Sequence, residues 1–512
     1  MPRPTFLTAA DRELAHAIAR LAYSNPFLPE RIEGERAALG ADFVPGGTLW
    51  HDSGETTPTP NLQQLQARTE TLVERLAARL DDGVKPTAED LSLYEDAVMY
   101  LLFSRYAEDF YALLMDRRAA TAPVAFYRKF RADAARLLQI PRTTLLADRD
   151  VHHLFAGFFQ IRRAFHYVFR YIIGNSPSIV RLRAAVWQSI FTRDMRRYRR
   201  TLYQRMGDVA TLICGPSGTG KELVARAIGL ARYIPFDADR QAFTEDYAGA
   251  FYALAPSALS PTLIESELFG HRRGAFTGAI QDRQGWLEVC PPLGTVFLDE
   301  IGELDSAMQV KLLRVLQTRT FQRLGDTRDR RFQGKLVAAT NRDLSREMEA
   351  GRFREDFYYR LCSDLIVTPS LAEQLRGAPG ERTALVTFIA RRVAGDAEGE
   401  ALAEETVRWI DGHLGDSYHW PGNVRELEQC VRNVMIRGEY RPPRAASPSA
   451  RQRIAEEVVA GALSADDVLR RYCTLVYADT GSYQETGRRL RLDRRTVREK
   501  IDARLLSELR GS

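Results

Sequence analysis

The sequence predicts a multidomain protein: a helical N-terminal region, an α/β domain with a parallel sheet and a helical lid, and an all-α C-terminal helix-turn-helix domain. Two observations predict the α/β domain. An apolar run from Ala210 to Cys214 leads into a glycine-rich loop and a helical pattern, and a second apolar run ends in Asp299 and Glu300. Strands that alternate with helices are typical of a parallel sheet. The third observation is a dense set of basic residues on the last of three short helical patterns near the C-terminus.

Composition sets the broad class of the protein. The chain has 512 residues, a net charge of +5, 45% hydrophobic residues and 27% charged residues, which is ordinary for a globular protein with several domains. No run of about 18 apolar residues is present, so neither export nor membrane spanning is expected. The five cysteines are dispersed without a C-x-x-C spacing. This pattern favours reduced thiols in a cytoplasmic protein over a disulfide framework or a zinc site.

Residues 1–170 are expected to be helical, because apolar residues recur there at intervals of three and four. One such face carries Leu62, Leu65, Leu72, Leu76 and Leu80, and a Phe-rich face carries Phe155, Phe158, Phe159, Phe165 and Phe169. We interpret the Phe-rich face as core, with a ligand pocket or a groove for a partner helix as the alternative. The interval from Gly46 to Pro60 contains Gly, Pro and Thr and is expected to be a loop. A basic stretch follows later, from Arg193 to Arg205, and favours a solvated helix face over a nucleic-acid contact.

The glycine-rich loop has the residue types and the context of a phosphate-binding loop between a strand and a helix. Glycines allow backbone N–H groups to converge on phosphate oxygens at a helix N-terminus, and a lysine neutralises their charge. A simple glycine turn is the alternative. The expected nucleotide-binding residues are Gly215, Pro216, Ser217, Gly218, Thr219, Gly220, Lys221 and Glu222.

The second apolar run, Gly294 to Leu298, supplies two adjacent carboxylates at its end. Asp299 is expected to hold Mg²⁺, directly or through water, and Glu300 to orient and polarise the attacking water. The alternative is a capped strand end without chemistry. Because both motifs occur in order and each follows an apolar strand, the sequence predicts nucleotide binding or hydrolysis.

The stretch from Glu265 to Ala279 is a poor core segment, because its glycines bury nothing and cost backbone entropy. We expect a flexible loop with Phe276 at its tip and Thr277 beside it, and such loops tend to carry function. The string resembles the sigma-54-contacting loop of bacterial enhancer-binding proteins, the AAA+ activators of sigma-54 RNA polymerase. The resemblance implies contact with sigma-54 through Gly274, Ala275, Phe276, Thr277, Gly278 and Ala279.

The resemblance also assigns roles to further residues. Residues 171–176 are similar to the opening block of the family's ATPase domain, and Glu222 is the family's usual residue at its position. Asn341 resembles a sensor that hydrogen-bonds the γ-phosphate or the water, with a strand-terminating turn as the alternative. Arg354 and Arg360 match two arginines that reach the neighbouring subunit's nucleotide, with local ion pairing as the alternative. Arg425 matches a lid arginine that contacts the phosphates. ATP and Mg²⁺ are the implied cofactors, and a homo-oligomeric ring, a hexamer by resemblance, is implied.

One residue departs from the family pattern. After the apolar segment from Phe251 to Leu254, the family carries an Asn that hydrogen-bonds the catalytic Glu and couples the nucleotide state to the loop. This sequence has Ala255, followed by Pro256, and neither side chain can donate that hydrogen bond. Either the coupling is rerouted or nucleotide switching is altered.

The C-terminal patterns run from Val468 to Ala478, from Tyr483 to Leu490 and from Asp493 to Leu505, and Asp493 is an expected N-cap. Residues 481–501 are similar to the Fis-type helix-turn-helix of many enhancer-binding proteins. Gly487 replaces one of its small alanines, which lowers helix propensity and keeps a close helix crossing possible. The expected DNA contacts are Arg494, Arg495, Thr496, Arg498 and Lys500.

These observations divide the chain into five parts. We expect a helical regulatory region of unidentified family at 1–170, an AAA+ ATPase subdomain at 171–370, a helical lid at 371–438, a Pro/Ser/Arg-rich linker at 439–460 and the helix-turn-helix domain at 461–512.

The expected protein is an ATP-hydrolysing transcription activator that binds DNA and remodels the closed complex of the sigma-54 RNA polymerase holoenzyme. Two alternatives stay open. One is a DNA-bound nucleotide sensor with impaired coupling, which Ala255 favours. The other is an AAA+ remodeller of a different protein client, with the N-terminal region as its adaptor.

Overall fold

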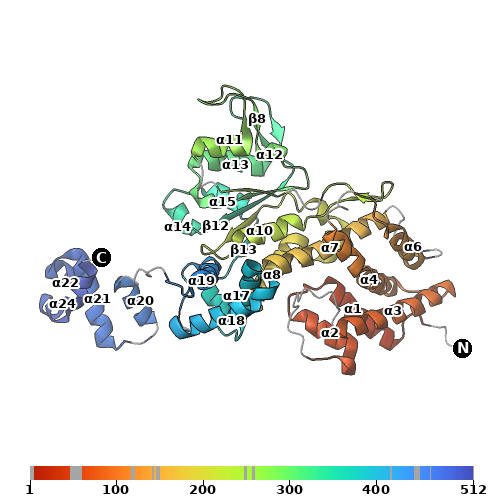
Figure 1. Cartoon of the computed structure of the whole chain (residues 1–512), viewed down its shortest axis with the longest axis horizontal. Coiled ribbons are helices and arrows are strands. Elements are labelled where there is room, and N and C mark those ends of the chain that lie inside the picture. Colours follow the sequence, from red (N-terminus) through yellow and green to blue (C-terminus); the bar gives the residue numbers. More distant parts are fainter. Residues whose placement is uncertain are drawn as a thin grey trace. The chain divides into compact units, whose positions relative to one another are not determined.

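The computed structural model describes residues 5–45, 60–116, 122–140, 143–145, 150–246, 251–255, 260–415, 418–442, 450–459, 461 and 463–510. The chain forms two compact units, Met1–Val431 and Arg432–Ser512. Each unit is described by itself below (Figure 1). The loop expected between Gly46 and Pro60 lies almost entirely outside the described residues.

The first unit contains a five-stranded parallel sheet in the order β13-β3-β12-β9-β6. Its strands are β3 (Thr211–Cys214), β6 (Phe251–Leu254), β9 (Thr295–Leu298), β12 (Lys335–Thr340) and β13 (Asp364–Val367). β12 separates β3 from β9, with Cys214 paired to Thr340 and Leu298 paired to Ala338. Since parallel strands end at the same edge, the loop after β3 and the carboxylates after β9 lie at one edge of the sheet.

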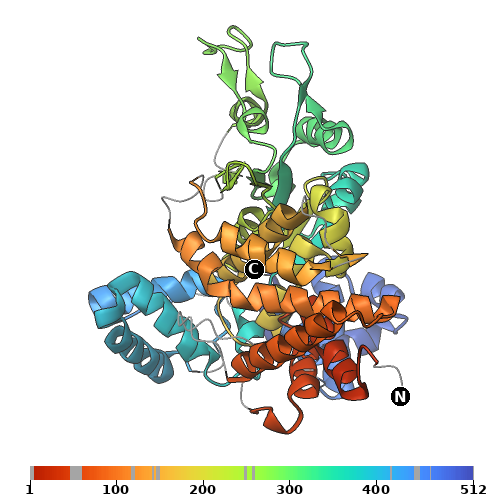
Figure 2. The ribbon, with the colours of Figure 1, turned by 90° about the vertical axis from the view of Figure 1, so that its right-hand side faces the viewer.

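The helices that alternate with these strands along the chain include α8 (Pro177–Phe191), α10 (Lys221–Leu230), α13 (Ser306–Thr318), α14 (Leu344–Glu349) and α15 (Glu355–Leu361). Two short hairpins leave the sheet. One pairs β7 (Gly270–His271) with β8 (Arg283–Gln284) between α11 (Pro261–Phe269) and α12 (Trp286–Val289), and the other pairs β10 (Thr320–Phe321) with β11 (Arg330–Arg331). They lie side by side, joined by a bridge between His271 and Leu324 (Figure 2). The expected lid is helical, with α16 (Leu371–Leu375), α17 (Glu381–Ala394), α18 (Asp396–His413) and α19 (Asn423–Arg437).

The N-terminal region is helical, as its periodicity predicts. Its helices are α1 (Ala9–Tyr23), α2 (Glu30–Leu39), α3 (Pro60–Asp81), α4 (Ala88–Arg105), α5 (Ala107–Met115), α6 (Tyr127–Leu138) and α7 (Val151–Tyr171). α1 and α4 each begin with a capping box, Thr8 with Asp11 and Thr87 with Asp90. The predicted faces are buried at Leu65, Leu72, Leu76, Phe155, Phe158 and Phe159, which confirms the core interpretation.

The N-terminal helices share one hydrophobic core with the α/β domain. α7 packs against α10, and Phe155 and Phe159 contact Phe236 and Phe243 of the short ladder β4 (Phe236–Asp237) and β5 (Ala242–Phe243) (Figure 1). The helical region is therefore built onto the sheet domain through a contiguous aromatic cluster.

The basic stretch from 193 to 205 is a solvated face only in part, since Arg193, Arg197, Arg200 and Arg205 are exposed. Its helix, α9 (Met195–Arg200), directs Arg196 to Asp96 and Arg199 to Glu95, both on α4. Two arginines of this stretch are thus ion-paired within the unit, because α4 places carboxylates opposite them.

The second unit contains α20 (Ala450–Val459), α21 (Ala465–Thr480), α22 (Tyr483–Leu490), α23 (Arg494–Lys500) and α24 (Ala503–Arg510). Asp493 is the N-cap of α23, as predicted, and accepts hydrogen bonds from the N–H groups of Arg495 and Thr496. The pattern predicted from 493 to 505 is broken, because the Asp502 N–H donates to Thr474 and its carboxylate receives the first N–H groups of α24. α20 lies within the stretch expected to be a linker, 439–460. Ala450 and Ile454 of this helix are buried, so this part of the stretch is folded.

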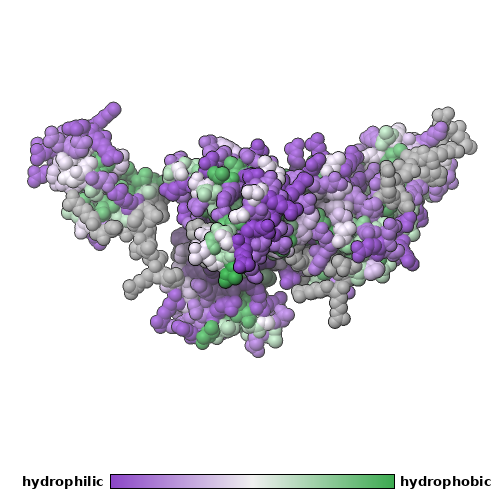
Figure 3. All heavy atoms as spheres, turned by 90° about the horizontal axis from the view of Figure 1, so that it is seen from above, coloured by the Kyte–Doolittle hydropathy of each residue, from purple (hydrophilic) through white to green (hydrophobic). Residues whose placement is uncertain are grey.

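The surface carries no sign of a membrane-spanning segment in the described ranges. None of their helices combines the length and the apolarity that crossing a bilayer requires. The face drawn in Figure 3 is mainly hydrophilic, with small apolar areas between. All five cysteines are free thiols, as expected from their spacing.

Candidate nucleotide site

The glycine loop follows β3 and ends where α10 begins, as the sequence predicts. Gly215 has φ +150°, and a Cβ atom there would lie 2.1 Å from the Thr368 hydroxyl oxygen, so a larger residue would clash. Gly220 is the N-cap of α10, with φ +86°. The loop therefore precedes the positive end of a helix dipole, a place suited to phosphate.

Lys221 lies back over this loop. Its Nζ donates to the carbonyl oxygens of Gly215 and Pro216, at 3.0 and 3.1 Å. Burial lowers the pKa of Lys221, while the carboxylates of Glu300 and Asp299 oppose that shift. The ammonium group is thus held inside the loop, close to two carboxylates, where it can neutralise phosphate.

The two carboxylates differ in environment. Burial raises the pKa of Asp299, and the Glu300 N–H, which donates to Asp299 Oδ1 at 3.0 Å, opposes that rise. Glu300 has φ +50°, in the left-handed region that residues with a side chain adopt rarely. Such conformations cluster at functional sites, where the surrounding structure maintains them.

A magnesium ion fits the donor set at Asp299. Mg²⁺ binds through one or two carboxylates and keeps waters and substrate phosphates as its other ligands. Glu222, the neighbour of Lys221, is ion-paired with Arg226 at 2.8 Å. No group of three potential metal ligands occurs within the described ranges.

Asn341 and Ala255 flank the carboxylates at the same sheet edge. Asn341 directly follows β12, and its side chain makes no hydrogen bond to any described residue. Ala255 directly follows β6, whose last residue Leu254 is paired with Leu298, so it lies beside the level of Asp299. A methyl group cannot donate a hydrogen bond to Glu300.

The lid contacts the glycine loop directly. Arg425 Nη1 lies 3.5 Å from Ser217 Oγ, and its backbone N–H donates to Gly218 O at 3.3 Å. Asn423 makes a connection that sequence reasoning missed: its Nδ2 donates to Ser217 O at 2.9 Å and its Oδ1 accepts from the Leu371 N–H at 2.8 Å. Its φ of +55° is a conformation that Asn tolerates better than most residues.

Arg354 and Arg360 lie apart from this loop. Arg354 is paired with Asp356 through two contacts of 2.8 and 3.0 Å, which is the local ion pair considered as its alternative. Arg360 is exposed and has no ion-pair partner in the part of the chain that the structure describes. Within that same part, no contact joins either guanidinium to the chain's own glycine loop.

Residues 274–279 form the turn between β7 and β8. Gly274 N–H donates to Ala279 O at 2.8 Å, and Asp282 accepts from the backbone of Arg273 and the side chain of Arg272. Thr277 is exposed, but Phe276 is half-buried, with its ring 5.0 Å from the His271 ring. The expected exposed aromatic tip therefore rests against its own hairpin, and His271 is itself held by Ser266 at 2.7 Å.

The five basic and polar candidates of α23 are not equally available. Arg494, Arg495 and Arg498 are exposed, without ion-pair partners among the residues described. Thr496 donates its hydroxyl to Asp493 at 2.7 Å, and Lys500 is ion-paired with Asp466. Three arginines thus remain for phosphate or base contacts.

Comparisons with known proteins agree with these motifs. Residues 189–366 match the family model described as the Sigma-54 interaction domain. The chain is similar to the hydrogenase transcriptional regulatory protein HoxA of Bradyrhizobium diazoefficiens, 45% identical over 233 residues, which cover 45% of this chain and 43% of that protein. It is also similar to the Nif-specific regulatory protein of Azotobacter vinelandii, 39% identical over 275 residues, 52% of this chain and 44% of the relative.

A third relative is the luminescence regulatory protein LuxO of Vibrio campbellii, 35% identical over 291 residues, 55% of this chain and 60% of LuxO. The matched part thus spans less than two thirds of each of these relatives. Among solved structures, NtrX from Brucella abortus in complex with ATP aligns with a TM-score of 0.39 at 22% identity, over 71% of this chain and 76% of NtrX.

Proposed function

From the match of residues 189–366 to the Sigma-54 interaction domain, we propose that this protein is a sigma-54-dependent transcriptional activator that hydrolyses ATP to remodel the closed complex of the sigma-54 RNA polymerase holoenzyme. It acts in the cytoplasm, bound to DNA through α23 and assembled as a ring, by resemblance a hexamer. The observation that carries the proposal is the joint presence, within residues 189–366, of the glycine loop, the carboxylate pair and the hairpin turn 274–279.

Water is the nucleophile in the proposed reaction, and no covalent enzyme intermediate is needed, because positioning and charge stabilisation suffice for phosphoryl transfer. Glu300 orients and polarises the water. Lys221 and Arg425 neutralise charge on the phosphates, consistent with the contacts that each makes to the glycine loop. Asp299 would hold Mg²⁺, which supplies positive charge at the phosphoryl oxygens.

Arg354 and Arg360 would complete the site of a neighbouring subunit. Their guanidinium groups are exposed on α15. Arginine suits this role because it spreads positive charge over developing phosphoryl charge. Arg354 would have to exchange its bond with Asp356 for the partner's phosphate, whereas Arg360 needs no exchange.

The turn 274–279 would bind sigma-54 through Thr277 and Phe276. Thr277 is already exposed, and Phe276 would leave His271 to reach the partner. Ala255 supports a second candidate, a DNA-bound nucleotide sensor with impaired coupling, because the position beside Asp299 lacks a hydrogen-bond donor to Glu300. A remodeller of another protein client is the third.

The test is capture of purified sigma-54 by the protein held with a γ-phosphate transition-state mimic. We expect wild type to capture sigma-54 and Thr277→Ala to lose it. Thr383→Ala is the matched control, because Thr383 is an exposed threonine on α17 of the lid. ATP turnover without any capture of sigma-54 would overturn the activator function and favour another client, and absence of turnover would favour the nucleotide sensor.

A further inference from the structure

The end of α10 remote from the glycine loop is capped by side chains of the N-terminal region. Arg163 Nη2 donates to Leu230 O, and its Nη1 donates to Arg232 O at 3.0 Å. Gln160 Nε2 donates to Ala231 O, also at 3.0 Å. Both side chains come from α7 and are almost fully buried, at 1% and 2% exposure for Gln160 and Arg163.

These contacts meet a physical need of the helix. The last carbonyl groups of a helix have no partner within the helix, and its C-terminus carries partial negative charge. The Arg163 guanidinium donates to the last helix carbonyl, at Leu230, and to the Arg232 carbonyl just beyond the helix end, so it supplies both a donor and a positive charge there. The carbonyls of three consecutive residues, 230–232, accept hydrogen bonds from side chains of α7. The C-terminal end of α10 is therefore capped by the N-terminal region and not by the α/β domain itself.

α10 connects this cap to the phosphate loop. The helix has 10 residues from Lys221 to Leu230, so it is about 15 Å long at about 1.5 Å per residue. Because a helix of this length is a rigid element, a shift at its C-terminal end would also shift Gly220 and Lys221 at its start. The cap is therefore mechanically continuous with the loop that holds the phosphates.

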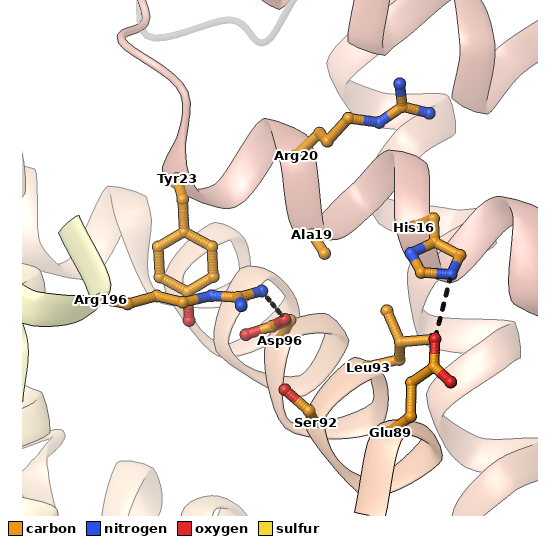
Figure 4. A pocket seen from close by; sticks show the side chains of 9 residues that line it. All are labelled: His16, Ala19, Arg20, Tyr23, Glu89, Ser92, Leu93, Asp96 and Arg196. Carbon is orange, nitrogen blue, oxygen red and sulfur yellow. Dashed lines mark hydrogen bonds and ion pairs between the residues drawn. The ribbon is translucent and has the colours of Figure 1, made fainter. Parts of the chain in front are cut away.

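A second connection joins the same cap to α1 and α4. Gln160 exchanges hydrogen bonds with the Tyr198 hydroxyl of α9, at 2.7 and 2.9 Å. Two residues earlier, Arg196 pairs with the buried Asp96 of α4, and its guanidinium lies 4.5 Å from the centre of the Tyr23 ring. Figure 4 shows this pair at one end of a pocket of about 390 Å³ between α1 and α4.

We propose that Gln160 and Arg163 are positioning residues for the phosphate loop, and that the N-terminal region controls nucleotide binding and turnover by moving α7 against α10. The inference rests on the proposed ATPase function. In this proposal the N-terminal region contacts α10 directly through α7, and α9 connects this contact to α1 and α4.

The first test is hydrogen–deuterium exchange on the full chain, which needs no activity. In Arg163→Met we expect amide exchange across residues 215–230 to be about tenfold faster than in wild type, because the end of α10 loses its cap. Arg163→Lys, which keeps a positive donor, should restore part of the protection. Arg162→Met is the matched control, since Arg162 is the neighbouring arginine of α7 and lies over the Tyr111 ring of α5.

The second test is ATP turnover by the same variants, measured well below their melting temperatures. We expect Arg163→Met to raise KM for ATP about fivefold, with a smaller change in kcat and partial rescue in Arg163→Lys. A purely structural role would lower the melting temperature and leave KM of the folded protein unchanged.

A folded Arg163→Met protein with wild-type exchange over 215–230 and wild-type KM would overturn the inference. If Arg163→Met does not fold, Gln160→Met gives the same readouts, because it removes the neutral hydrogen bond to Ala231 together with the two bonds to Tyr198 and leaves Arg163 in place. A wild-type protein without turnover would count against the ATPase function instead, and the exchange experiment would still decide the role of α7.

Discussion

Glu300 combines a strained backbone with a position beside the metal-binding candidate. Its φ of +50° turns the chain sharply after β9, and its N–H is tied to Asp299 at 3.0 Å. We predict that Glu300→Gln keeps ATP binding and lowers turnover by about 10²- to 10⁴-fold, the range that general base catalysis contributes. Phosphate release and fluorescent-nucleotide binding measure the two quantities.

Glu303→Gln is the control for this substitution. Glu303 lies three residues further on, in the same turn, and is ion-paired with Arg342 at 2.5 Å. Its turnover should stay near that of wild type. Turnover in Glu300→Gln within tenfold of wild type would show that another group positions the water.

A second prediction at the scale of residues concerns Lys335 and the pH dependence of the free energy of unfolding. It begins β12, donates to Val209 O at 2.7 Å, and burial lowers its pKa to about 7, with Arg232 adding to the shift. In the unfolded chain the ordinary lysine pKa is about 10.4. Between these values the unfolded chain binds a proton that the folded chain lacks, so this residue's contribution to the free energy of unfolding rises with pH by up to about 1.4 kcal/mol per unit.

Denaturant unfolding at pH 7.5 and pH 9 of wild type and Lys335→Met checks this prediction. Buried cysteines such as Cys290, whose pKa burial raises to about 12, act in the opposite direction in both proteins. The difference between the two proteins isolates Lys335, and we expect the wild type to gain more stability, or lose less, than the variant. An equal change in both proteins would mean that Lys335 stays charged when folded.

At the scale of elements, motifs that are contiguous in sequence were the predictable part of the fold and the site. The loop at 215–222 and the pair at 299–300 each lie between a strand and the element that follows it, so local pattern was sufficient. Periodicity also located the buried face of α7. It could not show that this face meets α10, because a helical pattern identifies an apolar face and not its partner.

Contacts between distant segments were the part that local pattern could not reveal. Asn423 reaches Ser217 and Leu371, 206 and 52 residues away, and nothing in its neighbourhood marks this bridge. Gln160 and Arg163 read as ordinary polar residues of an amphipathic helix until α10 is placed beside them. At Gly487 the structure gives another reason for a small residue than the expected helix crossing, since a Cβ there would lie 2.6 Å from Leu492 O in the turn between α22 and α23.

At the scale of the whole molecule, each chain contains a glycine loop and an exposed Arg360 that no described contact joins. A site that needs both must take them from two subunits. Under the proposed function, hydrolysis would depend on assembly, and a heterologous contact between identical chains forms a ring where its rotation closes. This arrangement would also allow two inactive variants to complement each other.

We predict that Lys221→Ala and Arg360→Ala are each inactive and that their 1:1 mixture recovers turnover. A site works when its own chain keeps Lys221 and its neighbour keeps Arg360, so random mixing in a ring leaves about a quarter of the sites complete. Phosphate release across a series of mixing ratios measures the recovery. Arg346→Ala, at an exposed arginine of α14 that is paired with its neighbour Asp343, should be active alone. Absence of recovery at every ratio, with ring assembly intact, would mean that Arg360 does not act across subunits.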